Sequence, residues 1–147
     1  MNTFDDISQE ELTVFFQEAD EQLQLLDEDL IRLEKEGADM ELLQGIFRAA
    51  HTLKGSSAMV GLEDMSRVAH AAETVLDKLR NKTLTIDTDV IDALLNSLDI
   101  LKILRQNIMG DEQPADIGAV LAELEKVSAG GSDTPGSQTD SGYMMNP

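Results

Sequence analysis

The chain of 147 residues is long enough for one domain and has a formal net charge of −18, from 29 acidic and 11 basic residues. This charge argues against nucleic-acid binding, because phosphates would be repelled, and aromatic rings for base stacking are scarce. The absence of cysteine excludes disulfides and cysteine-ligated zinc. The acidic N-terminus and the lack of an apolar run of about 18 residues predict no signal peptide and no membrane contact, so we expect a cytoplasmic location.

Helical periodicity begins at residue 8 and predicts a first helix that ends at Gly37. Ser8 and Glu11 have the spacing of a capping box, and Ile7 with Leu12 has the spacing of a hydrophobic staple. Apolar residues then recur at steps of three and four, which places them on one helical face: Leu12, Phe15, Phe16, Ala19, Leu23, Leu26, Leu30 and Leu33.

Two further helices follow with a glycine between them. The second is expected to start after Asp39, a good N-cap, and to run to about Val60, where Gly61 breaks it. Its apolar face consists of Leu43, Ile46, Phe47, Ala50 and Leu53. The third helix is expected to fray at Asn81 and Lys82. Its apolar face consists of Met65, Val68, Ala69, Ala72, Val75, Leu76 and Leu79.

The remaining helical segments are a long fourth helix and a weaker fifth one. The fourth is expected to begin at Asp87 and to end at Gly110, and the fifth to follow Pro114, a residue suited to the first helical turn. Residues 83–86, with the sequence TLTI, have strand-like composition, but a single strand would have no partner.

The pattern as a whole predicts an all-α fold, an antiparallel up-down four-helix bundle with a fifth C-terminal helix. Short connections force consecutive helices to pack side by side, which favours this topology. The bundle is expected to span residues 5–127 and to be monomeric in isolation. Residues 128–147 are rich in Gly, Ser, Thr, Pro and Asp and are expected to form a flexible linker toward further domains.

The most unusual stretch is HTLKG at residues 51–55. It lies in the only basic part of the chain, since residues 45–82 contain four acidic and six basic residues, a net charge of +2. His51 lies about 100° around the helix from Ala50, so we expect it at the edge of the core, where it shares a face with Lys54 and Gly55. Gly55 is unfavourable inside a helix by about 1 kcal/mol relative to alanine. It marks either a helix that loosens toward its end or a gap cleared beside the imidazole.

The second histidine lies on the next helix. His70 and Glu73 share a face there, and an antiparallel hairpin around Gly61 would pair His51 with Glu73 and Lys54 with His70. We therefore expect these four side chains to form one cluster. A carboxylate that accepts a hydrogen bond from one imidazole nitrogen leaves the lone pair of the other nitrogen outward, which makes a nucleophilic histidine. A neighbouring ammonium would attract a phosphoryl oxygen.

Other interpretations of these residues remain open at this point. A metal site formed by His51, His70 and Glu73 is one, although Lys54 would repel a cation and the Glu-x-x-His motifs of di-iron bundles are absent. A second interpretation is a non-catalytic acidic interaction module with ordinary surface histidines. Catalysis of acyl transfer is not expected, because the sequence has no serine nucleophile elbow and the second helix offers no oxyanion hole.

The stretch AAHTLKGSSAMVGLEDMSRVAHAAETVLD, residues 49–77, resembles the histidine phosphotransfer (HPt) domain. It is most similar to the N-terminal phospho-accepting domain of CheA-type chemotaxis histidine kinases. The motif H-x-x-K-G, the glycine six residues further on and the H-x-x-E of the next helix carry this resemblance. Two positions depart from the family pattern: Ser56 stands where a second glycine is common, and Val60 where an aromatic residue is common.

The resemblance implies a role for each residue of the cluster. His51 would be phosphorylated at Nε2, and Glu73 would orient its ring through Nδ1. Lys54 would contact the phosphate, and His70 would belong to the same network. Gly55, with Ser56 and Ala58, would give partners access to the ring.

The resemblance also implies the reaction and the partners. A separate ATP-binding histidine kinase domain, which uses ATP and Mg²⁺, would phosphorylate His51, and the phosphoryl group would pass to an aspartate of a response-regulator receiver domain. The chain contains no Walker-type or glycine-rich nucleotide loop. We therefore expect a phosphoryl carrier of a two-component system that is not an enzyme on its own and that has no cofactor in this domain.

Overall fold

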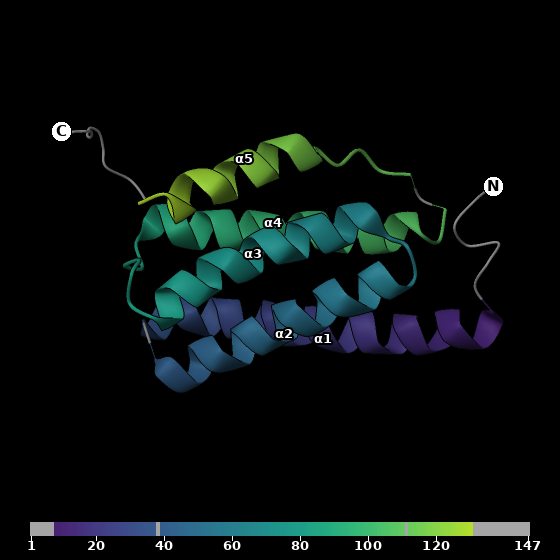
Figure 1. Ribbon diagram of the computed structural model, residues 1–147, viewed down its shortest axis with the longest axis horizontal. Coiled ribbons are helices and arrows are strands. Elements are labelled where there is room, and N and C mark those ends of the chain that lie inside the picture. The colour runs from purple at the N-terminus through teal and green to yellow at the C-terminus, as the bar shows by residue number, and fades with distance from the viewer. Residues whose placement is uncertain (1–7, 38, 111, 131–147) are drawn as a thin grey trace.

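The computed structural model describes residues 8–37, 39–110 and 112–130. These residues form five helices: α1 (Gln9–Glu36), α2 (Met40–Met59), α3 (Glu63–Arg80), α4 (Thr88–Asn107) and α5 (Ile117–Ser128) (Figure 1). No strand occurs in these ranges, and residues 83–86 belong to the connection between α3 and α4. The predicted all-α class is confirmed.

The predicted helix starts are present as hydrogen-bonded caps. The Ser8 hydroxyl accepts a hydrogen bond from the Glu11 amide at 3.0 Å, and the Glu11 carboxylate accepts one from the Ser8 amide at 3.0 Å, which completes a capping box. The side chains of Asp39 and Asp87 cap α2 and α4 by accepting hydrogen bonds from main-chain amides of the first turn, without the reciprocal bond of a capping box. Gly37 follows α1 with a φ of 85°, a left-handed conformation that favours glycine.

Several predicted boundaries differ from the structure. α4 ends at Asn107, three residues before Gly110, and Pro114 lies outside α5, which is capped by the Asp116 side chain. α5 ends at Ser128, so it extends one residue beyond the domain end expected at residue 127. Ile7 of the expected hydrophobic staple and residues 131–147 of the expected linker lie outside the described residues.

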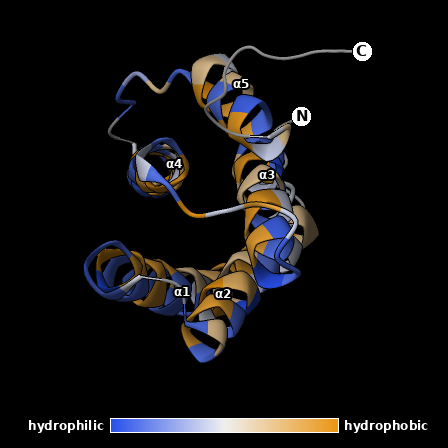
Figure 2. Cartoon of the chain, turned by 90° about the vertical axis from the view of Figure 1, so that its left-hand side faces the viewer, coloured by the Kyte–Doolittle hydropathy of each residue, from blue (hydrophilic) through white to orange (hydrophobic). Residues whose placement is uncertain are grey.

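Helices α1 to α4 form a ring in which each helix packs against the next and α4 closes against α1. Viewed from the end, the four helices enclose the core, and α5 lies beside α3 and α4 (Figure 2). The chain runs back and forth along the long axis of the molecule (Figure 1). The predicted four-helix bundle with a fifth C-terminal helix is confirmed.

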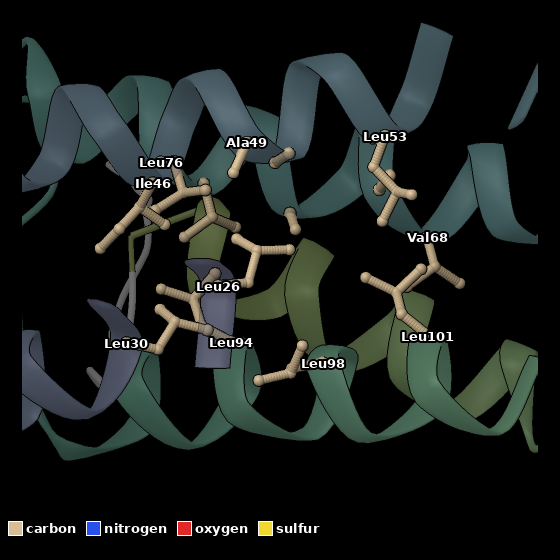
Figure 3. Close-up of a cluster of buried hydrophobic side chains, with 14 of the residues drawn as sticks. Leu26, Leu30, Ile46, Ala49, Leu53, Val68, Leu76, Leu94, Leu98 and Leu101 are labelled. Atoms are coloured by element: carbon tan, nitrogen blue, oxygen red, sulfur yellow. The ribbon is translucent and has the colours of Figure 1, made fainter. Parts of the chain in front are cut away.

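The core lies between the four helices and is built from the predicted apolar faces. Leu30 of α1, Ile46 of α2, Val68 of α3 and Leu98 of α4 point into the same interior (Figure 3). Each of these four side chains is at most 3% exposed. Because burial of a side chain of this size contributes about 1.5–3 kcal/mol, the core fixes the rotation of each helix about its axis.

The antiparallel α2–α3 pair has a register that the side-chain contacts define. Near one end, Arg80 of α3 donates to Gln44 of α2 at 3.2 Å. Near the other end, the Ser66 hydroxyl of α3 donates to the main-chain oxygen of Lys54 at 3.2 Å. The middle of α2 therefore faces the middle of α3, where His51 and Glu73 lie.

Candidate functional site

His51 lies in the middle of α2 on the side of the helix that faces α3. Its side chain is 60% exposed, whereas the neighbouring Ala50 and Leu53 are buried in the core. The buried residues hold the backbone of α2 in place, so the imidazole projects from a rigid element into solvent. The expected position of His51 at the edge of the core agrees with the structure.

Glu73 of α3 contacts both His51 and Lys54. One carboxylate oxygen, Oε2, accepts a hydrogen bond from Nδ1 of His51, and the other, Oε1, accepts one from the Lys54 ammonium at 2.8 Å. The Glu73 side chain is 11% exposed and that of Lys54 29%. The carboxylate is therefore nearly buried, but each of its oxygens has a cationic or N–H partner.

The protonation of Glu73 determines which nitrogen of His51 carries the proton. Burial raises the pKa of the Glu73 carboxyl, but the hydrogen bonds from Lys54 and His51 and the charge of Lys54 outweigh it, so the pKa lies below its ordinary value of 4.5. At neutral pH the carboxylate is ionised and can only accept hydrogen bonds, so the proton is on Nδ1. In the neutral imidazole, Nε2 then presents its lone pair to solvent.

His70 is not joined to this cluster in the structure. It is exposed, and its imidazole has no hydrogen-bond or ion-pair partner among the described residues. Its main-chain oxygen accepts a hydrogen bond from Thr74 at 3.1 Å. The hairpin register placed Lys54 beside His70, but the long lysine side chain extends one helical turn along α3 to Glu73.

The three candidate access positions differ in what surrounds them. Gly55 and Ala58 are exposed, and a Cβ atom added to Gly55 would have no neighbour within 4 Å. Packing inside the chain therefore does not require a glycine there. The Ser56 hydroxyl donates to the Glu18 carboxylate of α1 at 2.5 Å, which ties α1 to α2 near the site.

A groove of about 950 Å³ adjoins Ser56 and Ala58 between the start of α1 and the end of α2. Two apolar side chains at this groove, Val14 and Met59, are 62% and 88% exposed. Glu10 and Glu11 also line it, so an acidic margin accompanies the apolar surface. The access positions thus continue into a surface that a partner could contact.

Two residues near the site, Phe47 next to His51 and Arg80 next to Phe47, were not recognised in the sequence. The ring of Phe47, one turn before His51 on α2, is stacked on the imidazole with an angle of 12° between the planes. The Arg80 guanidinium of α3 lies 3.8 Å from the centre of the Phe47 ring. The spacing of four between Phe47 and His51 was visible, but Phe47 was assigned to the core; Arg80 could be found only from the α2–α3 register.

The part of the chain that the structure describes contains no group of three or more His, Asp or Glu side chains placed to hold a metal ion. The metal-binding interpretation therefore gains no support from these residues. Among the same residues, no helix is long and apolar enough to cross a membrane.

Comparisons with known proteins give one consistent result. The model of the Hpt domain matches residues 10–130. The chemotaxis protein CheA of Bacillus subtilis is 43% identical over 115 residues, which cover 78% of this chain and 17% of that protein. The chain therefore spans about a sixth of that relative's length.

Two solved structures have the same fold. The CheA phosphotransferase domain from Thermotoga maritima is 38% identical, with a TM-score of 0.65, and the match covers 71% of this chain and all of that one. The phosphorylated P1 domain of CheA3 from R. sphaeroides, solved in complex with CheY6, has a TM-score of 0.73 over 82% of this chain and 96% of that one. Its identity of 21% shows a common fold alone.

Proposed function

The chain belongs to the family of histidine phosphotransfer (HPt) domains, and on that premise we propose that its phosphoryl carrier is His51. In this proposal, an ATP-using histidine kinase domain phosphorylates His51, and an aspartate of a response-regulator receiver domain then accepts the phosphoryl group. The observation that carries the proposal is the exposed side chain of His51, whose Nδ1 is hydrogen-bonded to Glu73 so that Nε2 is left for the phosphoryl group. The wider pathway is taken to be chemotaxis-type, as in the CheA relatives.

The first step is attack by the Nε2 lone pair of His51 on the γ-phosphorus of ATP. The N–P bond forms, the bond from the γ-phosphorus to the bridging oxygen breaks, and ADP leaves with that electron pair. The Nδ1 proton stays in its hydrogen bond to Glu73, which stabilises the positive charge that develops on the ring. ATP and Mg²⁺ are brought by the kinase domain, which supplies the phosphate binding and charge neutralisation of this step.

The second step returns the lone pair to Nε2. A carboxylate oxygen of the receiver aspartate attacks phosphorus, the O–P bond forms and the N–P bond breaks. Lys54 is in this proposal the phosphate-contacting group, because its side chain is 29% exposed and its ammonium lies within the cluster, bonded to Glu73. It can turn from Glu73 toward a phosphoryl oxygen by side-chain rotation alone.

The structure supports the proposed roles of the remaining candidate residues to different degrees. We propose Gly55, Ser56 and Ala58 as the surface through which both partners reach His51, since a side chain at Gly55 would meet only solvent in the free chain. The structure gives no contact that supports a role for His70 in the network, since its ring lacks a partner among the described residues.

The test is phosphorylation of the purified chain by a CheA-type kinase domain with radiolabelled ATP. Acid-labile, base-stable label that disappears in His51→Gln and moves to an added receiver domain is the expected result. Label that survives in His51→Gln would contradict the assignment. Equal binding of the kinase and receiver domains without any label would favour the non-catalytic interaction module instead.

A further inference from the structure

The proposed reaction requires the His51 ring to be held in one orientation. The lone pair of Nε2 lies in the plane of the ring, so the ring plane sets the direction from which phosphorus can be attacked. Phosphoryl transfer depends mainly on such positioning, because the bonds that form and break must lie nearly in line. The hydrogen bond from Nδ1 to Glu73 holds one atom of the ring and does not by itself define the plane of the ring.

Phe47 supplies a restraint on that plane. The centres of the Phe47 and His51 rings are 6.1 Å apart and their planes differ by 12°, the geometry of an offset stack. Both residues lie on α2 and are separated by one helical turn, so the stack needs no distortion of the backbone. Phe47 is itself half-buried and packs against the hydrophobic core, which limits its own motion.

Arg80 holds the Phe47 ring from the neighbouring helix. Its guanidinium carbon lies 3.8 Å from the centre of the Phe47 ring, within the range of a cation–π contact. The guanidinium in turn donates to Asp77 at 2.6 Å and to Gln44 at 3.2 Å. Arg80 is therefore anchored on both α2 and α3, and it connects the α2–α3 interface to the ring that stacks on His51.

We propose that Phe47 and Arg80 are positioning residues for the phosphorylated histidine. Glu73 sets the tautomer of His51 and one point of its ring, and the Arg80–Phe47 stack sets the plane of the ring. This inference rests on the proposed function, since it assigns a role in the phosphorylation of His51. Neither residue touches the phosphoryl group.

Three variants separate the parts of the stack. Phe47→Leu removes the aromatic ring and keeps an apolar side chain, and Phe47→Tyr restores the ring. Arg80→Met removes the guanidinium and leaves the Phe47 ring in place. Arg67→Met is the matched control, because Arg67 is an exposed arginine of the same helix whose ion pair is with Asp64 at 3.6 Å and which does not contact Phe47.

The two measurements are the NMR shifts of the His51 ring protons and the rate of labelling at saturating kinase domain. The ring current of Phe47 should displace the His51 proton shifts, and Phe47→Leu should abolish that displacement. The same variant should lower the maximal rate about three- to tenfold, the range that one aromatic pair contributes, without a matching change in KM. Phe47→Tyr should recover both quantities, and Arg80→Met should move both in the direction of Phe47→Leu by a smaller amount.

Different results identify which proposal fails. If the wild-type chain is labelled but Phe47→Leu leaves either its rate or the His51 ring shifts unchanged, each unchanged quantity alone overturns the positioning role and leaves the proposed function intact. An Arg67→Met variant as slow as Arg80→Met overturns the specific role of Arg80 and leaves a general effect of positive charge. A wild-type chain that gains no label overturns the proposed function and the positioning role with it, even where the ring shifts show the stack.

Discussion

Glu73→Ala is the substitution with the largest expected effect on reactivity outside His51 itself. It removes the acceptor that holds the proton on Nδ1, so the imidazole can place its proton on either nitrogen. A hydrogen bond to a charged group contributes about 1.5–3 kcal/mol, which corresponds to a roughly ten- to hundredfold slower phosphorylation of His51 if the bond is fully used in the transition state. The upper half of this range applies only if the ring also loses its orientation.

The effect of Glu73→Ala on the fold should be much smaller. The substitution leaves Lys54 without its carboxylate, but the lysine side chain is 29% exposed and can be solvated by water. We therefore expect the free energy of unfolding to fall by about 1–2 kcal/mol, less than the loss of a fully buried ion pair. Alanine also favours the helix at this position. The helical circular dichroism signal should be unchanged at room temperature.

The assay compares initial rates of labelling for wild type, Glu73→Ala and Asp64→Ala at equal concentrations of kinase domain. Asp64→Ala is the control, because it also removes a carboxylate from α3 but one that is exposed and pairs with Arg67. Heteronuclear NMR of the ring nitrogens reports the tautomer of His51 directly. A Glu73→Ala chain that is folded and labelled at the wild-type rate would refute the role of Glu73 in setting the tautomer.

Four further outcomes are expected. The pKa of the Glu73 carboxyl is lowered from its ordinary value of 4.5 in the folded chain. The ionised carboxylate therefore stabilises the fold fully above pH 4.5, and this stabilisation is lost as the pH falls through the lowered pKa. The unfolding temperature of Glu73→Gln should therefore fall less steeply than that of wild type as the pH is lowered into the acid range. Gly55→Ala should raise the free energy of unfolding by about 0.5–1 kcal/mol in denaturant titrations, since the added Cβ meets nothing, whereas Gly55→Leu should stay folded and slow transfer from both sides of the relay. His70→Gln should change the labelling rate less than Glu73→Ala does, and an equal loss would place its ring in the network after all. Ser8→Ala should lower the unfolding free energy by about 1 kcal/mol through the lost cap and leave the labelling rate at the wild-type value.

Much of the fold could be predicted because local chemistry and periodicity agree. Ser8 with Glu11, and Asp39 and Asp87, are capping residues whose function depends only on neighbours a few positions away. The end of α4 was placed three residues too late, because the residues after Asn107 continue as turns before Gly110 adopts a φ of 100°. Turns of this kind change the spacing of apolar residues too little for the sequence to reveal them.

The candidate site could be predicted only as far as the helix register determines it. The hairpin register brought Glu73 to His51, and the structure has that contact. The same register assigned Lys54 to His70, because it considers backbone positions and ignores the reach of a lysine with four methylene groups. Arg80 likewise contacts Phe47 through a long side chain, although the sequence alone placed Arg80 only at the end of a helix.

The position of His51 in the middle of a regular helix has a kinetic consequence. A side chain that is 60% exposed on the outer surface of a bundle is not enclosed by its own chain, so in the proposed relay each partner would itself have to exclude water from the reacting atoms. Two folded domains cannot cover the same imidazole at once. Donor and acceptor would therefore visit in alternation, and a large excess of either would slow the turnover of the relay by occupying the surface that the other needs.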